Sequence, residues 1–564
     1  MGARRRAGKQ SPVASGKVLP LLLSVAGGLA VFASFPPVDA WPLTVLGPAL
    51  LVVALAGRSL RGSFLCGLAF GLALFVPLLS WLVNVAWYGW AALAGAEAVI
   101  FAALAVGQRM LLRLPFWPAA VAGWWVLVEG VRDRWPFAFP WGRLAMSQSV
   151  APDVRWVAVG GVPLLSFLVA LTGAMLARAA LYSLGGNDPP QTPPAPGGTY
   201  PPRPPLGGTH PPRPPLGGTH PPRPALGGAR RPPILPWLAA VATAGLVLAG
   251  GLLPVDPAGG APTAQVAAIQ GNVPRARNLP QQLSSSQVTQ NHVATTLTLA
   301  AQVKAGRLAD PDLVIWPENS TDNDPFQNPS VYAELSATVA AVGRPVLVGE
   351  VLNDPRRNVG QLWVPGRGPT TAYVKRQLVP FGEYIPFRGL ISSFSNLPSL
   401  QPIDFTPGHR AVVFDTGDIR LGDVICYEVG FDNLVRSEVT AGANLLAVQS
   451  NDADFEIDGQ LGETEQQTAM ARIRAVETDR AVVYASTTGE STIIAPDGGL
   501  IAHSGVWQRA ILDARVPLVS YRTLADRIGA WPEYVIVMLT VLALAWAVRR
   551  TWSSRTRRTR TKIA

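Results

Sequence analysis

Three residues of complementary chemistry follow apolar, strand-like segments in the second half of the chain. Glu318 follows "LVIWP", Lys375 follows "TTAYV" and Cys426 follows "GDVI". A thiol is mostly protonated at neutral pH, so a nucleophilic cysteine needs a base, and Glu318 could take its proton. A carbonyl under attack develops an oxyanion, which Lys375 and a backbone N–H could stabilise. The set favours attack by Cys426 on a carbonyl group.

Taken singly, each of these residues has an ordinary structural explanation. A lone cysteine after an apolar strand is more often a packing residue, a glutamate after Trp-Pro a turn residue, and a lysine in "YVKRQL" a solvated one. Their shared position favours chemistry, because the ligands of open α/β sheets gather at the carboxyl ends of the strands. We therefore expect Glu318, Lys375 and Cys426 to converge.

Other catalytic chemistries have no support in the sequence. It contains no HExxH, CxxC, phosphate-loop or GxSxG motif, so we expect neither a metal ion nor another cofactor. The histidines of the same half lie in no motif, which weakens a Cys–His pair; they are His292, His409 and His503. His210 and His220 belong to a repeat and are not interpreted as metal ligands.

The three candidate residues lie in a segment, 256–523, that alternates between strand-like and helix-like patterns. Strands interleaved with helices predict a layered α/β domain. The expected strands are 264–270, 312–318, 344–351, 411–417, 419–428, 444–450 and 481–487, and the expected helices are 284–305, 329–342, 431–441 and 460–479.

Long apolar stretches dominate the rest of the chain. Of its 564 residues, 49% are hydrophobic and 15% are charged, whereas about a quarter are charged in an average soluble domain. Crossing the hydrocarbon core of a bilayer takes roughly 20 apolar residues. The chain therefore predicts a multi-pass α-helical membrane domain with eight spans. These lie near 17–35, 40–57, 63–86, 89–112, 116–131, 157–182, 234–253 and 528–548.

Basic residues indicate how these spans are oriented. The net charge is +11, but lysines and arginines cluster at the chain ends and in short connectors, and no nucleic-acid-binding motif is present. Membrane orientation therefore explains them better than nucleic acid does. With eight spans the basic segments share the cytoplasmic side, so both termini are cytoplasmic and 256–523 lies outside. Four arginines break this pattern and suggest a loop that faces a polar ligand; they are Arg132, Arg134, Arg143 and Arg155.

Composition divides the chain further. Residues 184–232 repeat a Pro/Gly-rich unit, "PPRPPLGGTH", which predicts a disordered cytoplasmic linker. Cys66 lies in an apolar span and Cys426 in the outer domain, so we expect no disulfide. The expected organisation is a membrane domain at 1–183 (spans one to six), the linker at 184–232, span seven at 233–255, a catalytic domain at 256–523, span eight at 524–550 and a basic tail at 551–564.

Three motifs carry a resemblance to a known family. "IWPEN", "YVKRQLVPFGEYIPF" and "GDVICYEVGF" resemble the signatures of the nitrilase superfamily, with the glutamate, lysine and cysteine 57 and 51 residues apart. The second motif is similar to that of the apolipoprotein N-acyltransferases, the integral membrane branch of the superfamily. "ASFPPVDAWPL", "FPWGRLAMSQ" and "QGNVP" extend the resemblance over nearly the whole chain.

This resemblance implies a fold, a reaction and roles for individual residues. The outer domain would be a nitrilase-like αββα sandwich. Cys426 would be the nucleophile, Glu318 the general base and Lys375 the oxyanion stabiliser, with Glu383, Tyr427 and Glu428 in support. The enzyme would move an acyl chain from a membrane phospholipid through a thioester to the N-terminal α-amine of a diacylglyceryl apolipoprotein. We expect a monomer in the bacterial cytoplasmic (inner) membrane.

The sequence also departs from the family at three single positions and in the stretch "ETEQQ" (463–467), where the family usually has a His-containing stretch. Asp454 stands where a Trp is usual, Glu456 where a Gly is usual and Thr487 where an Asn is usual, which puts in doubt how the nearby loop meets lipid. Two rival hypotheses remain open: a membrane-tethered amidase, and an inactive lipid-binding scaffold. Apolar residues of the outer loop would line a lipid entrance or form an interfacial belt; they are Trp135, Phe137, Phe139 and Trp141.

Overall fold

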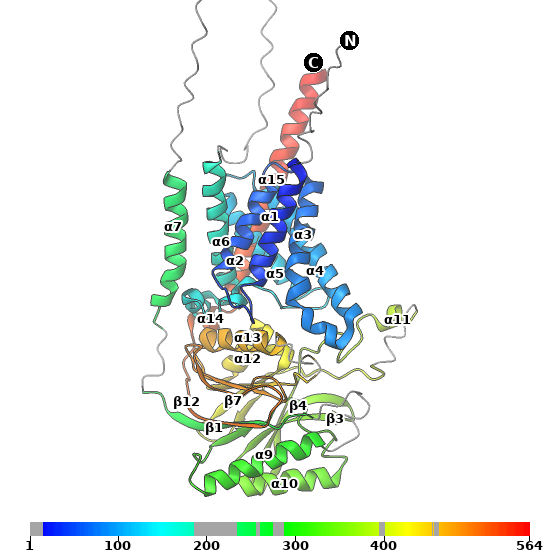
Figure 1. Cartoon of the computed structure of the whole chain (residues 1–564), viewed down its shortest axis with the longest axis vertical. Helices are drawn as coiled ribbons and strands as arrows, with labels where there is room; N and C mark the ends of the chain where they lie inside the picture. The colour runs from blue at the N-terminus through cyan, green and yellow to red at the C-terminus, as the bar shows by residue number, and fades with distance from the viewer. Residues whose placement is uncertain are drawn as a thin grey trace, which may run out of the picture.

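The chain forms a helical domain and an α/β domain stacked end to end in the computed structural model (Figure 1). The structure describes residues 15–184, 234–254, 260–273, 287–393, 401–453, 455 and 462–563. The predicted linker, 184–232, lies outside the described residues except for Leu184. Asp454 and Glu456 lie outside them as well.

Each of the eight predicted spans falls on a helix. These are α1 (Ser15–Phe32), α2 (Leu43–Leu55), α3 (Leu60–Leu78), α4 (Val83–Leu111), α5 (Trp117–Arg132), α6 (Val157–Ser183), α7 (Ile234–Leu248) and α15 (Trp531–Ile563). Five helical segments of the described chain are long and apolar enough to cross a membrane: Leu60–Leu78, Ser80–Leu111, Pro152–Ser183, Ile234–Leu252 and Trp531–Arg550. Helix α2, with 13 residues, is only about 20 Å long. The count of eight spans therefore stays a prediction.

The third helix ends earlier than the sequence pattern predicted. Instead of running over 63–86, α3 ends at Leu78, directly after Pro77. A short 3-10 turn, η1 (Ser80–Leu82), then leads into α4. The hydropathy of 79–86 is that of a span, so the apolar pattern alone did not reveal the turn. Helices α3 and α4 pack closely, since a side chain at Gly67 would collide with the backbone of Phe101.

Two six-stranded sheets form the α/β domain. The strand order is β12-β1-β2-β3-β4-β5 in the first sheet and β11-β10-β9-β8-β7-β6 in the second. The strands are β1 (Thr263–Gln270), β2 (Leu313–Ile315), β3 (Val346–Asn353), β4 (Arg356–Val364), β5 (Gly368–Val374), β6 (Val413–Asp415), β7 (Arg420–Ile425), β8 (Leu445–Ser450), β9 (Val482–Ser486), β10 (Thr492–Ile494), β11 (Leu500–His503) and β12 (Ala510–Pro517). The seven expected strands are present, and β4, β5 and β10 to β12 add to them.

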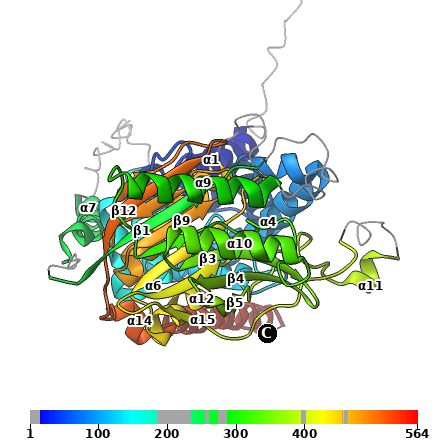
Figure 2. The ribbon, with the colours of Figure 1, turned by 90° about the horizontal axis from the view of Figure 1, so that it is seen from below.

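Helices cover the outer faces of both sheets and complete an αββα sandwich, as expected. Helices α9 (Gln287–Lys304) and α10 (Pro329–Val342) lie across the first sheet, which Figure 2 shows from below. Helices α12 (Asp432–Ala441) and α13 (Glu463–Thr478) lie between the second sheet and the membrane helices (Figure 1). The end of the α/β domain that carries α12 and α13 is therefore the end that meets the helical domain.

Candidate active site

The strands that lead to the three candidate residues belong to both sheets. Strands β2 and β3 are parallel, and β4 runs antiparallel to both β3 and β5, so β2 and β5 end at the same edge of the first sheet. Glu318 and Lys375 follow those ends. Cys426 follows β7, in the second sheet. The three residues thus lie at strand ends, as expected, but the strands belong to both sheets: the site forms where two stacked sheets end together.

The first sheet supplies a tightly bonded cluster of charges. Lys375 Nζ donates to Glu318 Oε1 at 2.9 Å and to Glu383 Oε1 at 3.0 Å. Asn358, in β4, donates through Nδ2 to the same two oxygen atoms, at 2.6 and 2.9 Å. The lysine side chain is only 1% exposed. The ammonium is thus fixed between two carboxylates, and among the described residues no third partner occupies its remaining N–H.

The second sheet also provides a hydrogen bond to the carboxylate of Glu318. Glu318 Oε2 accepts a hydrogen bond from the backbone N–H of Asn451, which directly follows β8, at 3.0 Å. Thr487, which follows β9, donates to Asn451 Oδ1 at 2.8 Å. The departure at Thr487 therefore leaves a hydroxyl that positions the loop behind the carboxylate.

Cys426 sits at a sharp turn from strand to helix. It is the first residue of the 3-10 helix η6 (Cys426–Gly430), and its φ is 53°, in the left-handed region. That conformation costs a non-glycine residue about 1–2 kcal/mol. Such backbone strain is concentrated at functional sites in proteins. The thiol is buried, and its Sγ accepts a hydrogen bond from Gln467 Nε2 of α13 at 3.5 Å.

Glu428 connects the turn at Cys426 to the segment that carries Lys375. Its fully buried carboxylate accepts from the backbone N–H of Ile425 at 2.8 Å and from the Tyr373 hydroxyl at 2.7 Å. It also accepts from the backbone N–H groups of Arg376 and Gln377, at 2.7 and 3.0 Å. One side chain therefore holds together the ends of β5 and β7, which come from different sheets.

Tyr427 points away from the sulfur, toward the helical domain. Its hydroxyl donates to the carbonyl oxygen of Ala138 at 2.7 Å. Its ring stacks on that of Trp141, with centroids 5.4 Å apart. Phe139 stacks on the other side of Trp141, so two of the four outer-loop aromatic residues are buried in this stack. Trp135 is 67% exposed and remains available to lipid.

Burial and charge set the protonation of the site. Burial raises the pKa of the Cys426 thiol well above its usual range, and Glu318 raises it further although Lys375 opposes both. Burial also raises the pKa of Glu318, and the nearby Lys375 only partly offsets this. Burial lowers the pKa of Lys375, but the carboxylates of Glu318 and Glu383 outweigh that effect and hold it well above its usual range. The resting site therefore holds a thiol beside an ammonium group.

The structure joins Glu318, Lys375 and Glu383 in one bonded cluster and places Cys426 close enough to interact electrostatically with Glu318 and Lys375. Glu383 accepts from Lys375 and Asn358, and also from the backbone N–H of Val379 at 2.8 Å. Asn358, Asn451 and Gln467 were not predicted. Asn451 lies at a strand end like Cys426, which was an available signal. Gln467 lies in the stretch "ETEQQ", which departs from the family, whereas nothing in the sequence marks Asn358. Within the described ranges, no group of three or more His, Cys, Asp or Glu residues is placed to hold a metal ion.

Comparison with known proteins gives consistent relatives. Residues 27–175 match the apolipoprotein N-acyltransferase N-terminal domain, and residues 265–526 match the carbon-nitrogen hydrolase family. An apolipoprotein N-acyltransferase from Mycolicibacterium smegmatis is 34% identical, over 94% of this chain and 85% of that protein. The one from Azotobacter vinelandii is 29% identical, over 94% and 95%. Among solved structures, an amidase from Nesterenkonia sp. is 19% identical with a TM-score of 0.34, over 45% of this chain and 90% of that one.

Proposed function

The chain belongs to the apolipoprotein N-acyltransferase family, and from that premise we infer how its own residues carry out the reaction. It is a bacterial membrane enzyme, an acyltransferase of the carbon–nitrogen hydrolase superfamily. The acyl donor is a membrane phospholipid, and the acceptor is the N-terminal α-amine of a diacylglyceryl apolipoprotein. The α/β domain works on the outer side of the cytoplasmic membrane, with both termini in the cytoplasm, an orientation supported by the placement of lysines and arginines.

The first half of the reaction loads the enzyme. Glu318 takes the proton of Cys426 as the sulfur attacks the ester carbonyl of the phospholipid. Lys375, whose third N–H is turned to no described residue, donates to the oxyanion that forms. When the carbonyl re-forms, the bond to the glycerol oxygen breaks and that oxygen takes the proton from Glu318. Lysophospholipid leaves, and the acyl chain remains on Cys426 as a thioester.

The second half unloads the acyl chain. The α-amine attacks the thioester carbonyl, and Lys375 again holds the oxyanion. Glu318 accepts the proton that the nitrogen loses as the amide forms. The C–S bond breaks, and the departing sulfur takes that proton back. The products are an N-acylated lipoprotein and free enzyme.

The raised pKa values favour proton transfer during attack over a preformed thiolate. With burial and Glu318 both disfavouring a sulfur anion, the thiol is the resting form. A base bonded to Lys375 and Asn358 stays in position for each proton transfer. Catalysis then depends on the position of Glu318 more than on an unusually acidic cysteine.

One observation carries the proposal: a complete Glu–Lys–Cys set converges, buried, where the α/β domain meets a bundle of apolar helices. A soluble amidase reaction would need no such bundle. An inactive scaffold would need neither the strained turn at Cys426 nor the shared hydrogen bonds around Lys375.

Intact mass spectrometry tests the thioester directly. The full-length enzyme is incubated with phospholipid alone and compared with Cys426→Ala. We expect a mass gain of one acyl chain that hydroxylamine removes and that the variant lacks. A folded enzyme that gains no acyl chain from any of several phospholipids, or a variant that gains it equally, would contradict the proposal.

A further inference from the structure

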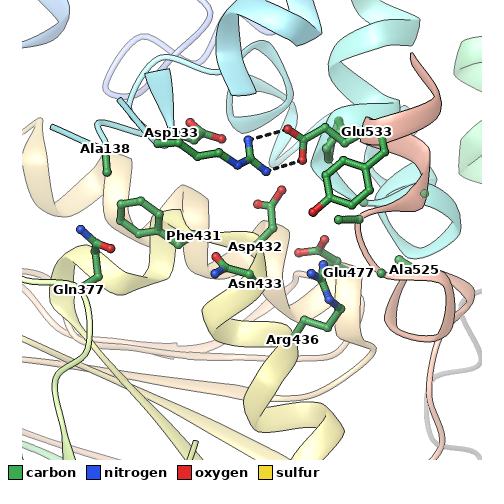
Figure 3. Close-up of a pocket in the computed structure, with 17 residues that line it drawn as sticks. Asp133, Ala138, Gln377, Phe431, Asp432, Asn433, Arg436, Glu477, Ala525 and Glu533 are labelled. Atoms are coloured by element: carbon green, nitrogen blue, oxygen red, sulfur yellow. Dashed lines mark hydrogen bonds and ion pairs between the residues drawn. The ribbon is translucent and has the colours of Figure 1, made fainter. Parts of the chain in front are cut away.

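A charged pocket of about 350 Å³ lies where the helical domain meets the α/β domain (Figure 3). Its walls come from the end of α5, the kink of α6 at Gly160 and Gly161, and helices α12, α13, α14 (Leu524–Ile528) and α15. Cys426, Lys375 and Glu318 are not among the residues that line it. Its six charged side chains are Asp133, Arg134, Asp432, Arg436, Glu477 and Glu533.

Most of these charges already have a partner in the protein. Arg134 binds Glu533 through two hydrogen bonds, at 2.6 and 2.8 Å. Asp432 accepts from Arg143 at 3.0 Å and from Arg474 at 2.7 Å. These pairs neutralise one another and form the frame of the pocket, so they need no ligand.

Two of the charged side chains that line the pocket, Arg436 and Asp133, still have unused hydrogen-bonding capacity. Across the part of the chain that the structure describes, the guanidinium of Arg436 makes no hydrogen bond or ion pair, although Arg436 lines the cavity beside Glu477 (Figure 3). Asp133 pairs with Arg143 through Oδ2 at 2.9 Å, but its Oδ1 is buried and has no hydrogen-bond partner among the described residues. For Asp133 this matters because a buried polar atom without a hydrogen bond costs about 1–3 kcal/mol. Arg436 is partly exposed and favours an anionic group, and Asp133 Oδ1 can accept from an N–H or O–H donor. A ligand with an anionic group and an ammonium supplies both.

The position of the pocket indicates where such a ligand comes from. Tyr534 of α15 lines it and is 56% exposed, and Trp531, one turn earlier, is 68% exposed. Exposed Trp and Tyr at the end of an apolar helix mark the level of the lipid head groups. We propose that this pocket binds the head group of a membrane phospholipid that carries both a phosphate and a primary ammonium. The phosphate binds Arg436 and the ammonium binds Asp133, separately from the acyl donor at Cys426.

Two residues that line the pocket contact residues that follow Cys426 in the chain. They are Gln377 and Phe431. The backbone N–H of Gln377 donates to Glu428, and the ring of Phe431 packs edge-on against Tyr427 at 5.3 Å. A head group in the pocket would therefore contact the neighbours of Tyr427 and Glu428, the two residues that follow Cys426. The pocket also accounts for two of the four arginines that break the charge pattern of the loops, since Arg134 and Arg143 build its frame.

Lipid retention measured by native mass spectrometry tests this site. The parent is full-length Cys426→Ala, which cannot consume the donor, and phosphatidylethanolamine and phosphatidylglycerol are offered in parallel. Adding Arg436→Gln should remove one retained phosphatidylethanolamine per chain, with affinity at that site falling roughly tenfold to a hundredfold, as for the loss of one charge-assisted hydrogen bond. Arg436→Lys, which keeps the cation, should retain that lipid. Arg307→Gln, on the exposed surface, is the matched control.

Three results would overturn the proposal. One is an equal phosphatidylethanolamine count in the parent and in Arg436→Gln. Another is an equal loss in Arg307→Gln, which would show a nonspecific charge effect. The third is an equal loss of phosphatidylglycerol in Arg436→Gln, which would mean that the ammonium is not recognised. Unchanged thermal unfolding of the lipid-free Arg436→Gln protein would show that the pocket, and not the fold, was altered.

Discussion

The two sheets contribute to the candidate active site in different ways. On the first sheet, Lys375 is bonded to two carboxylates that also share the amide of Asn358. On the second sheet, the sulfur of Cys426 accepts one hydrogen bond, at 3.5 Å, from Gln467. The charged groups are thus each held by several hydrogen bonds, while the sulfur itself has one long hydrogen bond among the described residues. This difference suits a sulfur that must carry an acyl chain and then release it, beside charges that act in both steps.

Of the changes considered, removal of the proposed base Glu318 should slow the reaction most. Glu318→Gln keeps the shape of the side chain but cannot accept the thiol proton, so thioester formation should slow about a hundredfold to ten-thousandfold. Quench-flow sampling followed by intact mass spectrometry measures the rate. Glu334→Gln, on the outer helix α10, is the control and should keep the parent rate. A Glu318→Gln enzyme as fast as the control would mean that the hydrogen-bonded cluster around Lys375 has only a structural role.

The pH dependence should report the same carboxylate. Burial raises the pKa of Glu318 above its usual 4.5. As pH falls through that raised pKa, Glu318 gains a proton and can no longer act as a base, so the rate should fall about tenfold per pH unit. Lys375, with its pKa held well above the usual range, should add no alkaline loss below about pH 10.

A pH–rate profile of thioester formation checks this expectation. The acid limb should disappear in Glu318→Gln, because the remaining slow reaction no longer depends on that proton. An acid limb centred at 4.5 or below in the parent enzyme would contradict the raised pKa.

Weakening the hydrogen bonds of Glu428, which join the ends of β5 and β7, should lower the stability of the fold. In Glu428→Gln, one acceptor oxygen becomes an NH₂ group that faces backbone N–H donors, which should cost about 1–3 kcal/mol. The thermal unfolding midpoint should fall by several degrees. Glu490→Gln is the control, because Glu490 pairs with the 63%-exposed His503 and such surface pairs contribute at most about 1 kcal/mol. Equal midpoints for the two variants would refute the role assigned to Glu428.

The smallest effect on the rate should come from losing the hydrogen bond to the sulfur of Cys426. Gln467→Ala removes the hydrogen bond to Cys426 Sγ together with those that Gln467 shares with Ser450, Tyr484 and Glu463. Loss of the neutral bond to the sulfur should slow thioester formation roughly threefold to tenfold. Gln302→Ala, on α9, serves as the control. A loss as large as that of Glu318→Gln would show that the sulfur is held as strictly as the charges.

The sequence predicted much of this site, and the reasons for what it missed are physical. Glu318, Lys375 and Cys426 end apolar strand-like runs, and their motifs resemble a known family. Asn358 lies within β4, where one amide in a strand has no pattern of its own. Gln467 reaches the sulfur only because α13 crosses the second sheet. That contact depends on packing between segments far apart in the chain, which no local pattern records.

The fold was predicted to a similar extent. Strands β10 to β12 were missed, since they are short or carry charged residues such as Asp513 and Arg515. The convergence of the site was expected from the strand ends, which are visible in the sequence, but the sequence pattern does not show which of two stacked sheets each strand joins. The early end of α3 was missed because the residues that follow it are largely apolar. Their hydropathy therefore does not distinguish a turn from the continuation of a span.

The contact between Tyr427 and the loop after α5 has a mechanical consequence. The residue next to the nucleophile is tied by a hydrogen bond to Ala138 and by ring stacking to Trp141, so it cannot shift independently of the bundle in the bilayer. An excised α/β domain would keep Glu318, Lys375 and Cys426 but lose the contacts with Ala138 and Trp141 that hold the residue beside the sulfur.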